Sequence, residues 1–229
     1  MTFRAILPIL AITVVAASAK LATAQEADKK PAQSQGKTGH LEVPRDPFIK
    51  IPRSAQPTSP GFRFSRNGYV SVQVNVDENG DNIVGDAANE PSIAIDPTDP
   101  SKIVIGWRQF DSVDSDFRQS GVAYSHDAGL TWTFPGSLWP GHFGSDPVLA
   151  ADSSGNFYYT AIGFDDPGVR LFRSFDAGVT WDGPWQILRA FRDKQWVVID
   201  QTGGIGDGNL YMTWSHPLNF TRSTDGGLT

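Results

Sequence analysis

The chain has 229 residues, with 19 Lys and Arg, 25 Asp and Glu, and a formal net charge of −6. It has no cysteine, which excludes disulfide bonds and a lipid anchor on an N-terminal cysteine. The acidic balance argues against general nucleic-acid binding, because that function needs a basic surface, but it leaves room for a local basic pocket for an anionic sugar.

The first 24 residues have the pattern of a secretory signal peptide. Arg4 precedes an apolar run over residues 5–17, and small residues around Ala19 and Ala24 suit cleavage. The run is too short to cross a bilayer comfortably, and Lys20 interrupts it, so an uncleaved anchor is the weaker alternative. Cleavage after Ala24 leaves 17 basic and 25 acidic residues, and predicts a secreted or periplasmic protein without membrane contact.

Residues 25–45 are expected to form a flexible leader. This stretch consists mainly of Lys, Gln, Gly, Ser and Pro, with almost no large apolar side chain. It cannot bury enough surface to offset the entropy lost on ordering. The folded part is therefore predicted to be residues 46–229.

The loop Asp77–Asn82 resembles a calcium-binding loop in composition and follows a predicted strand over Tyr69–Val76. It lacks the distal bidentate Glu of an EF-hand, so a polar hairpin turn explains it equally well. No other cofactor is expected. Zinc is not indicated, because the four histidines are scattered without ligand spacing: His40, His126, His142 and His216.

A repeated pattern of short strands occupies the rest of the chain. Three apolar strands each begin at a charged residue and end at an aspartate: Glu90–Asp96, Asp146–Asp152 and Lys194–Asp200. Turn residues lead from each to a second strand, over residues 103–107, 157–160 and 210–214. Third strands over residues 121–124 and 169–173 run into a recurrent phrase, and a fourth strand leaves it.

The recurrent phrase occupies Ser125–Trp132, Ser174–Trp181 and Ser223–Thr229. Its central aspartates are 49 residues apart both times, a period that fits propeller blades of four short strands. The third copy stops one residue before its expected tryptophan. We therefore expect a longer protein in which further blades carry much of the function.

The phrase has a structural explanation. Its Ser and Asp can bond the amides of a tight hairpin, its Gly takes a positive φ, and its Trp covers the blade edge. An aspartate engaged in this way has little left to offer a substrate. The predicted structural residues are Ser125, Asp127, Gly129, Trp132, Ser174, Asp176, Gly178, Trp181, Ser223, Asp225 and Gly227.

These phrases resemble the Asp-boxes, or BNR repeats, of the sialidase superfamily of β-propellers. The resemblance covers about residues 89–229, and two of its three copies are complete. Within that superfamily the chain looks like the secreted bacterial BNR-repeat proteins labelled glycosyl hydrolases or exo-α-sialidases. The resemblance implies an all-β fold, a β-propeller of four-stranded antiparallel blades, of which about three lie in this chain.

Strand order predicts which end of the blades holds the chemistry. If the phrase joins strands three and four, the loops between strands two and three, and between blades, lie at the opposite end. Charged residues that start the inner strands would ring the mouth of the central channel, where we expect a glycan or a protein ligand. The expected substrate-binding residues are Arg108, Arg118, Arg192, Glu90, Asp146, Asp193 and Lys194.

An anionic sugar needs arginines for its carboxylate and a carboxyl group for acid–base chemistry. Asp111, Asp114 and Asp116 lie on the loop that fits this role and are the expected catalytic candidates. For each of them, a solvated loop charge or an Arg–Asp pair within one loop is the alternative.

The sialidase pattern is departed from at one point. That family places the first arginine of a triad in a Phe-Arg-Ile-Pro motif, whereas Phe48–Pro52 is out of register and has Lys50. The other two arginines and a Tyr/Glu pair belong to later blades in the family. Two functions therefore remain open: a secreted sialidase-like glycoside hydrolase acting at the channel mouth, and a non-catalytic propeller that binds a glycan or a partner protein.

About three blades would leave a blade face and its strand edges unpaired. We therefore expect the chain on its own to aggregate, as measured by size-exclusion chromatography and thermal melting. A monodisperse monomer that melts cooperatively would contradict this expectation.

Overall fold

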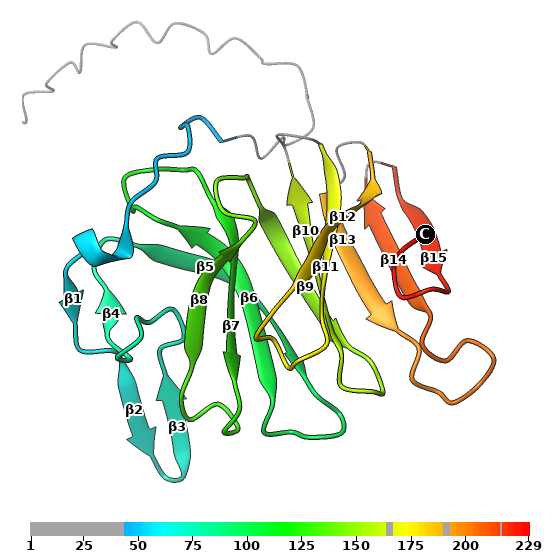
Figure 1. The fold of residues 1–229 in the computed structure, drawn as a ribbon, viewed down its shortest axis with the longest axis horizontal. Coiled ribbons are helices and arrows are strands. Elements are labelled where there is room, and N and C mark those ends of the chain that lie inside the picture. The colour runs from blue at the N-terminus through cyan, green and yellow to red at the C-terminus, as the bar shows by residue number, and fades with distance from the viewer. Residues whose placement is uncertain (1–43, 164–166, 190–192, 216) are drawn as a thin grey trace, which may run out of the picture. The chain divides into compact units, whose positions relative to one another are not determined.

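The structure is a computed structural model that describes residues 44–163, 167–189, 193–215 and 217–229. The predicted signal peptide and the predicted leader up to residue 43 lie outside the described residues. The described part is all-β, apart from a short 3-10 helix at Arg53–Ala55. Antiparallel sheets follow one another along the chain, as Figure 1 shows, and form part of a β-propeller.

The described residues form two complete four-stranded blades and three strands of another, each in sequence order. The first blade is β5 (Ala87–Ile95), β6 (Ile103–Phe110), β7 (Gln119–Ser125) and β8 (Thr133–Leu138). The second is β9 (Ser145–Ala151), β10 (Phe157–Gly163), β11 (Gly168–Ser174) and β12 (Asp182–Leu188). The third is β13 (Asp193–Ile199), β14 (Leu210–Ser215) and β15 (Asn219–Ser223). The predicted four-stranded repeat is confirmed, and most strands are longer than predicted.

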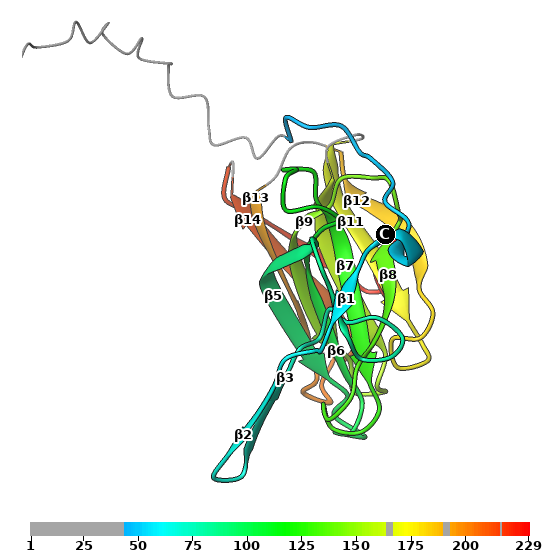
Figure 2. The same ribbon diagram turned by 90° about the vertical axis from the view of Figure 1, so that its left-hand side faces the viewer.

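The chain before the first blade forms two small sheets. β1 (Thr58–Ser59) pairs with β4 (Asn82–Ile83), and β2 (Arg63–Arg66) pairs with β3 (Tyr69–Val72). The two-residue loop of the second pair, Asn67-Gly68, has positive φ at both positions, which suits a hairpin with right-handed twist. Figure 2 shows this hairpin extending away from the blades. The strand predicted over Tyr69–Val76 ends earlier, at Val72.

The blades are held together by side chains that alternate between the two faces of each sheet. On one face of the second blade, Leu149 and Tyr159 pack with Val104 of the first. On the opposite face, Val148 and Tyr158 join a cluster with the third blade. Since both faces are covered, every residue of β10 is buried, and its sequence is a nearly continuous apolar run.

Each recurrent phrase is a hairpin turn closed by its own side chains. In the first copy, Ser125 Oγ donates to Asp127 Oδ1 over 2.7 Å and accepts the Gly129 amide at 2.9 Å. Thr131 donates to Asp127 through its amide at 2.9 Å and its hydroxyl at 2.6 Å. Trp132 Nε1 donates to the Gly129 carbonyl at 3.1 Å. The Asp carboxylate is thus occupied by its own turn, as the sequence predicts.

The same bonds recur in the other copies. Ser174 Oγ accepts the Gly178 amide at 2.8 Å, and Ser223 Oγ accepts the Gly227 amide at 2.8 Å. The sequence predicts positive φ at the glycine, but the residue before it shares that conformation, with φ of 59° at Ala128. A turn with two left-handed positions explains this, since its twist matches that of the flanking strands.

Hydrogen bonds in the turn also set the acidity of its carboxyl group. The hydroxyl of Thr131, its amide and the hydroxyl of Ser125 lower the pKa of Asp127 to about 2 from its ordinary value of 3.8. A carboxyl group whose pKa falls on folding stabilises the native state above its unfolded pKa. This contribution is lost as the pH falls from about 4 towards 2.

Replacing Ser174 with alanine tests the structural role of the phrase. Ser174 is fully buried, so Ser174→Ala leaves the buried Gly178 amide without its acceptor and should reduce the free energy of unfolding by about 1–3 kcal/mol. Ser223→Ala is the matched control, because it removes the same bonds from a less buried turn. Denaturant melts of both variants measure the difference, and equal losses would contradict a role for burial.

Candidate functional site

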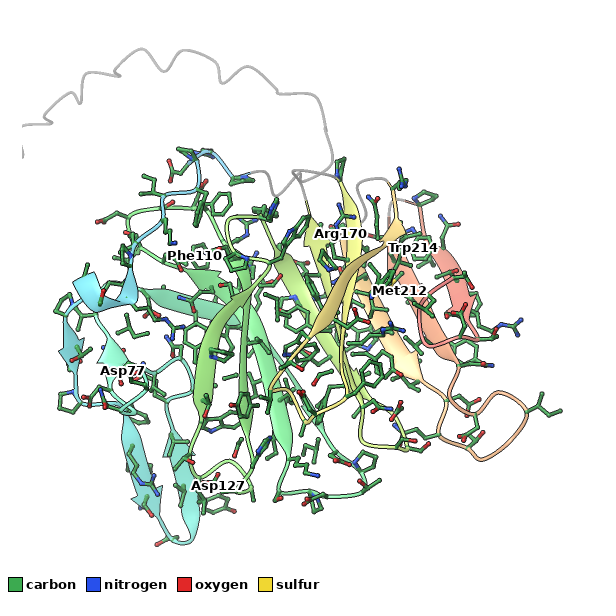
Figure 3. The ribbon with its side chains drawn as sticks, viewed as in Figure 1. Asp77, Phe110, Asp127, Arg170, Met212 and Trp214 are labelled. Atoms are coloured by element: carbon green, nitrogen blue, oxygen red, sulfur yellow. The ribbon has the colours of Figure 1, made fainter. Side chains whose placement is uncertain are left out.

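The two ends of the blades have different contents. In Figure 3, Asp127 of the first recurrent phrase lies at one end, whereas Phe110, Arg170 and Trp214 lie at the other. We call the second end the loop face; it includes the β6–β7 loop over residues 111–118 and the β8–β9 connection over residues 139–144. The prediction that the recurrent phrase and these loops lie at opposite ends is confirmed, whereas the prediction that the loop face holds the chemistry stays a prediction.

An unusual backbone conformation recurs where the inner strands start. Glu90, Asp146 and Lys194 have φ of 51°, 51° and 53°. The register of each inner strand with its neighbour shifts at this point, so each residue starts a β-bulge. A residue other than glycine whose backbone adopts the left-handed region costs free energy, and such residues cluster at functional sites.

Arg108 on β6 links two of these bulges. Its Nη2 forms an ion pair with Glu90 of the same blade, and its Nη1 lies 3.9 Å from Asp146 Oδ1 of the next blade. Its Nε donates to Asn89 Oδ1 at 2.9 Å. The Arg108 side chain is only 12% exposed, so this guanidinium bridges two blades at a largely dehydrated position.

Arg118 reaches the same place from the β6–β7 loop. Its Nε donates to Ser145 Oγ at 3.4 Å, and its Nη1 donates to the Asp116 carbonyl at 3.1 Å. Ser145 Oγ in turn donates to Asp146 Oδ1 at 2.7 Å. We call Glu90, Arg108, Arg118, Ser145 and Asp146 the bridging network; the structure brings together four of the predicted substrate-binding residues.

Arg170 on β11 is a loop-face arginine that the sequence analysis missed. It is buried, and its guanidinium lies 5.5 Å from the ring of Trp139. Trp139 stacks on His142 with their ring centroids 3.7 Å apart. An arginine within the apolar strand Val169–Phe172 was the available signal, because charged side chains are rare inside buried strands.

The third blade contributes the other predicted binding residues. Lys194 Nζ lies 5.7 Å from the ring of Trp196, and the Asp193 carbonyl accepts the Ser215 hydroxyl at 2.9 Å. The fully buried Gln195 side chain donates to the Asp146 carbonyl of the second blade. Arg192 lies outside the described residues.

The three predicted catalytic aspartates have different surroundings. Asp116 accepts the amides of Arg45 and Asp46, which keep its pKa below the ordinary value. Asp114 is exposed. Burial raises the pKa of Asp111, whose Oδ2 accepts the Gln119 amide at 2.8 Å. A catalytic role stays a prediction for each, and the bridging network contains none of their side chains.

The loop at Asp77–Asn82 closes as a polar turn. Asp77 Oδ1 accepts the amides of Asn79 at 2.8 Å and Asp81 at 2.9 Å. Of the two interpretations of this loop, a calcium-binding loop and a polar hairpin turn, the hairpin turn describes this geometry. In the described part of the chain, no group of at least three His, Cys, Asp or Glu side chains is arranged to hold a metal. No helix among the same residues is long and apolar enough to cross a membrane.

No protein-family model matches the chain, and no curated protein matches it. Among solved structures, it is similar to a protein of unknown function from Dyadobacter fermentans, with 18% identity and a TM-score of 0.42 over 64% of the chain and 56% of that protein. It is similar to the Hadza microbial sialidase Hz136, with 16% identity and a TM-score of 0.48 over 74% and 39%. It is also similar to an exo-β-1,3-galactanase from Phanerochaete chrysosporium, with 16% identity and a TM-score of 0.47 over 76% and 42%.

The chain spans between 39% and 56% of the length of these three proteins. The fold described above rests on the sheets of the chain itself, with their strand order and register.

Removing the central guanidinium tests whether the bridging network is coupled. Arg108→Met leaves the carboxylates of Glu90 and Asp146 without their shared partner and should reduce the free energy of unfolding by about 1–3 kcal/mol. Adding Asp146→Asn should recover part of this loss, because one unpaired charge is removed. Arg66→Met on the exposed β2 strand is the control and should change stability by less than about 0.5 kcal/mol. Losses that simply add in the double variant would contradict the coupling.

Proposed function

We propose that this chain is part of a secreted or periplasmic, sialidase-like glycoside hydrolase that binds and cleaves a glycan on its loop face. The observation that carries the proposal is that Arg108 contacts two carboxylates from neighbouring blades, Glu90 and Asp146. Both residues lie at β-bulges of the inner strands and have left-handed backbone conformations. The proposed fold family is that of the Asp-box propellers.

Glycoside hydrolysis needs two carboxyl groups at one place, and Glu90 and Asp146 both contact the Arg108 guanidinium. Glycoside hydrolases hold their two carboxyl groups about 5–9.5 Å apart, the distance deciding between a retaining and an inverting reaction. In this proposal, one of the pair protonates the leaving oxygen, and the other acts on the anomeric carbon or on a water.

The surrounding side chains supply the binding groups. Arg108, Arg118 and Arg170 lie around the start of the second blade and can bind a sugar carboxylate or several hydroxyls. A glycan is therefore the ligand class that this set of residues fits best.

A non-catalytic propeller that binds a glycan or a partner protein is the second candidate. The observation that favours it is the pairing inside the bridging network, where Asp146 already accepts a hydrogen bond from Ser145 at 2.7 Å. Residues that satisfy one another can serve as a rigid recognition surface without taking part in proton transfer.

The two candidates are separated by turnover. The full chain is assayed on a panel of fluorogenic 4-methylumbelliferyl glycosides that includes a sialoside. Glu90→Gln and Asp146→Asn should each lower kcat/KM by about 10²–10⁴-fold, because each removes a group that exchanges a proton or stabilises the transition state. Glu78→Gln, an exposed carboxylate in the turn after β3, is the matched control.

Hydrolysis that survives both substitutions would overturn the assignment of these residues. Sugar binding without any turnover would favour the second candidate. Variants are compared after their thermal melting has shown that they fold.

A further inference from the structure

A cavity lies on the opposite side of the first blade from the bridging network. It has a volume of about 370 Å³ and lies between the segment 48–56 and strands β6 and β8. Because neighbouring residues of a strand point to opposite faces, Arg108 points to the second blade, whereas Gln109 points to Asp86 in this cavity. The two places are separate.

One guanidinium, that of the exposed residue Arg53, lines the cavity. Arg53 Nη1 donates to the Phe134 carbonyl at 2.7 Å, and its Cζ lies 3.8 Å from the centre of the Phe134 ring. Burial lowers the pKa of Arg53, while the charges of Asp86, Asp111 and Asp77 act in the opposite direction. The contact with the Phe134 ring and the hydrogen bond to the Phe134 carbonyl hold the guanidinium at the cavity wall.

The cavity also holds two half-buried carboxyl groups. Asp86 Oδ2 accepts the Gln109 amide at 3.0 Å, and Asp111 Oδ2 accepts the Gln119 amide at 2.8 Å. Burial raises the pKa of both groups. Asp111 Oδ1 accepts no hydrogen bond from any residue that the structure describes.

These charged groups are not paired with one another. Within the described residues, no ion pair joins Arg53 to Asp86 or Asp111, although all three line the same cavity. Desolvating charged groups without pairing them costs free energy. A ligand that accepts from Arg53 and donates to the carboxylates would offset that cost.

We propose that this cavity binds a neutral saccharide of one or two rings, at a site separate from the bridging network. Its hydroxyls donate to Asp86 and Asp111 and accept from Arg53, and its C–H faces lie against the apolar walls formed by Phe48, Ile51 and Pro140. The carboxylates disfavour an anionic sugar, and Arg53 disfavours a cationic one. The volume lies at the small end of the range of about 300–1,000 Å³ that is usual for ligand pockets.

Ligand-observed NMR and calorimetry on the full chain test this site. The probes are the methyl glycosides of glucose, galactose and mannose, with cellobiose and lactose, at millimolar concentrations. At least one should bind, and Asp111→Asn should weaken its binding by about tenfold or more, because hydrogen bonds to a charged group are lost. Asp207→Asn, an exposed aspartate of the third blade, is the control and should leave the affinity unchanged.

A second variant keeps the test independent of the carboxylate itself. Ser137→Trp places a bulky side chain on the cavity wall and should also abolish binding, while thermal melting shows that each variant folds. Glu90→Gln is expected to lower hydrolysis but to leave binding in this cavity unchanged. Hydrolysis and binding therefore report separately on the proposed function and on this proposal. The proposal is overturned if no probe binds, or if Asp111→Asn and Ser137→Trp bind as well as the unaltered chain.

Discussion

The fold depends on one constraint: each blade must bury both faces of its sheet. The second blade meets this constraint, since Leu149 and Tyr159 pack on one neighbour while Val148 and Tyr158 pack on the other. Side chains of a strand alternate between faces, so a single apolar run serves two interfaces at once. The outer blades expose part of this surface: Ile93 on β5 is 56% exposed, and Trp196 on β13 is 53% exposed. In the second blade, by contrast, a neighbouring blade covers the corresponding side chains on each face of the sheet.

The two ends of each blade solve different physical problems. At one end, the recurrent Ser-x-Asp-x-Gly phrase uses its own side chains to satisfy the amides of a tight turn, which leaves the aspartates engaged in local hydrogen bonds. At the other end, left-handed residues bend each inner strand and bring charged side chains of adjacent blades together. Local hydrogen bonding thus stabilises the first end, while the backbone strain and the buried charges are concentrated at the second.

Charged side chains gather at two places in the molecule, the bridging network and the cavity. In the bridging network, Arg108 pairs with Glu90 of its own blade and with Asp146 of the next, and Arg118 donates to the Ser145 hydroxyl of the next blade. In the cavity beneath residues 48–56, Asp86 and Asp111 are partly buried, and no ion pair among the described residues joins them to Arg53. The bridging network joins two blades, and the cavity has a carboxylate oxygen, Asp111 Oδ1, that could still accept a hydrogen bond from a ligand.

The sequence by itself determined the repeat, the four-strand unit, the hydrogen bonds inside the phrase and the placement of the phrase and the β6–β7 loop at opposite ends of the blades. These features are local: a 49-residue period, turn residues and alternating side chains are all visible within one segment. Only the tertiary structure decided which charges meet. Arg108 and Asp146 come from different blades, Arg170 lies inside a buried strand, and Asp111 lines a cavity together with Phe48. Such contacts depend on how whole sheets pack, and a pattern along one strand does not encode that packing.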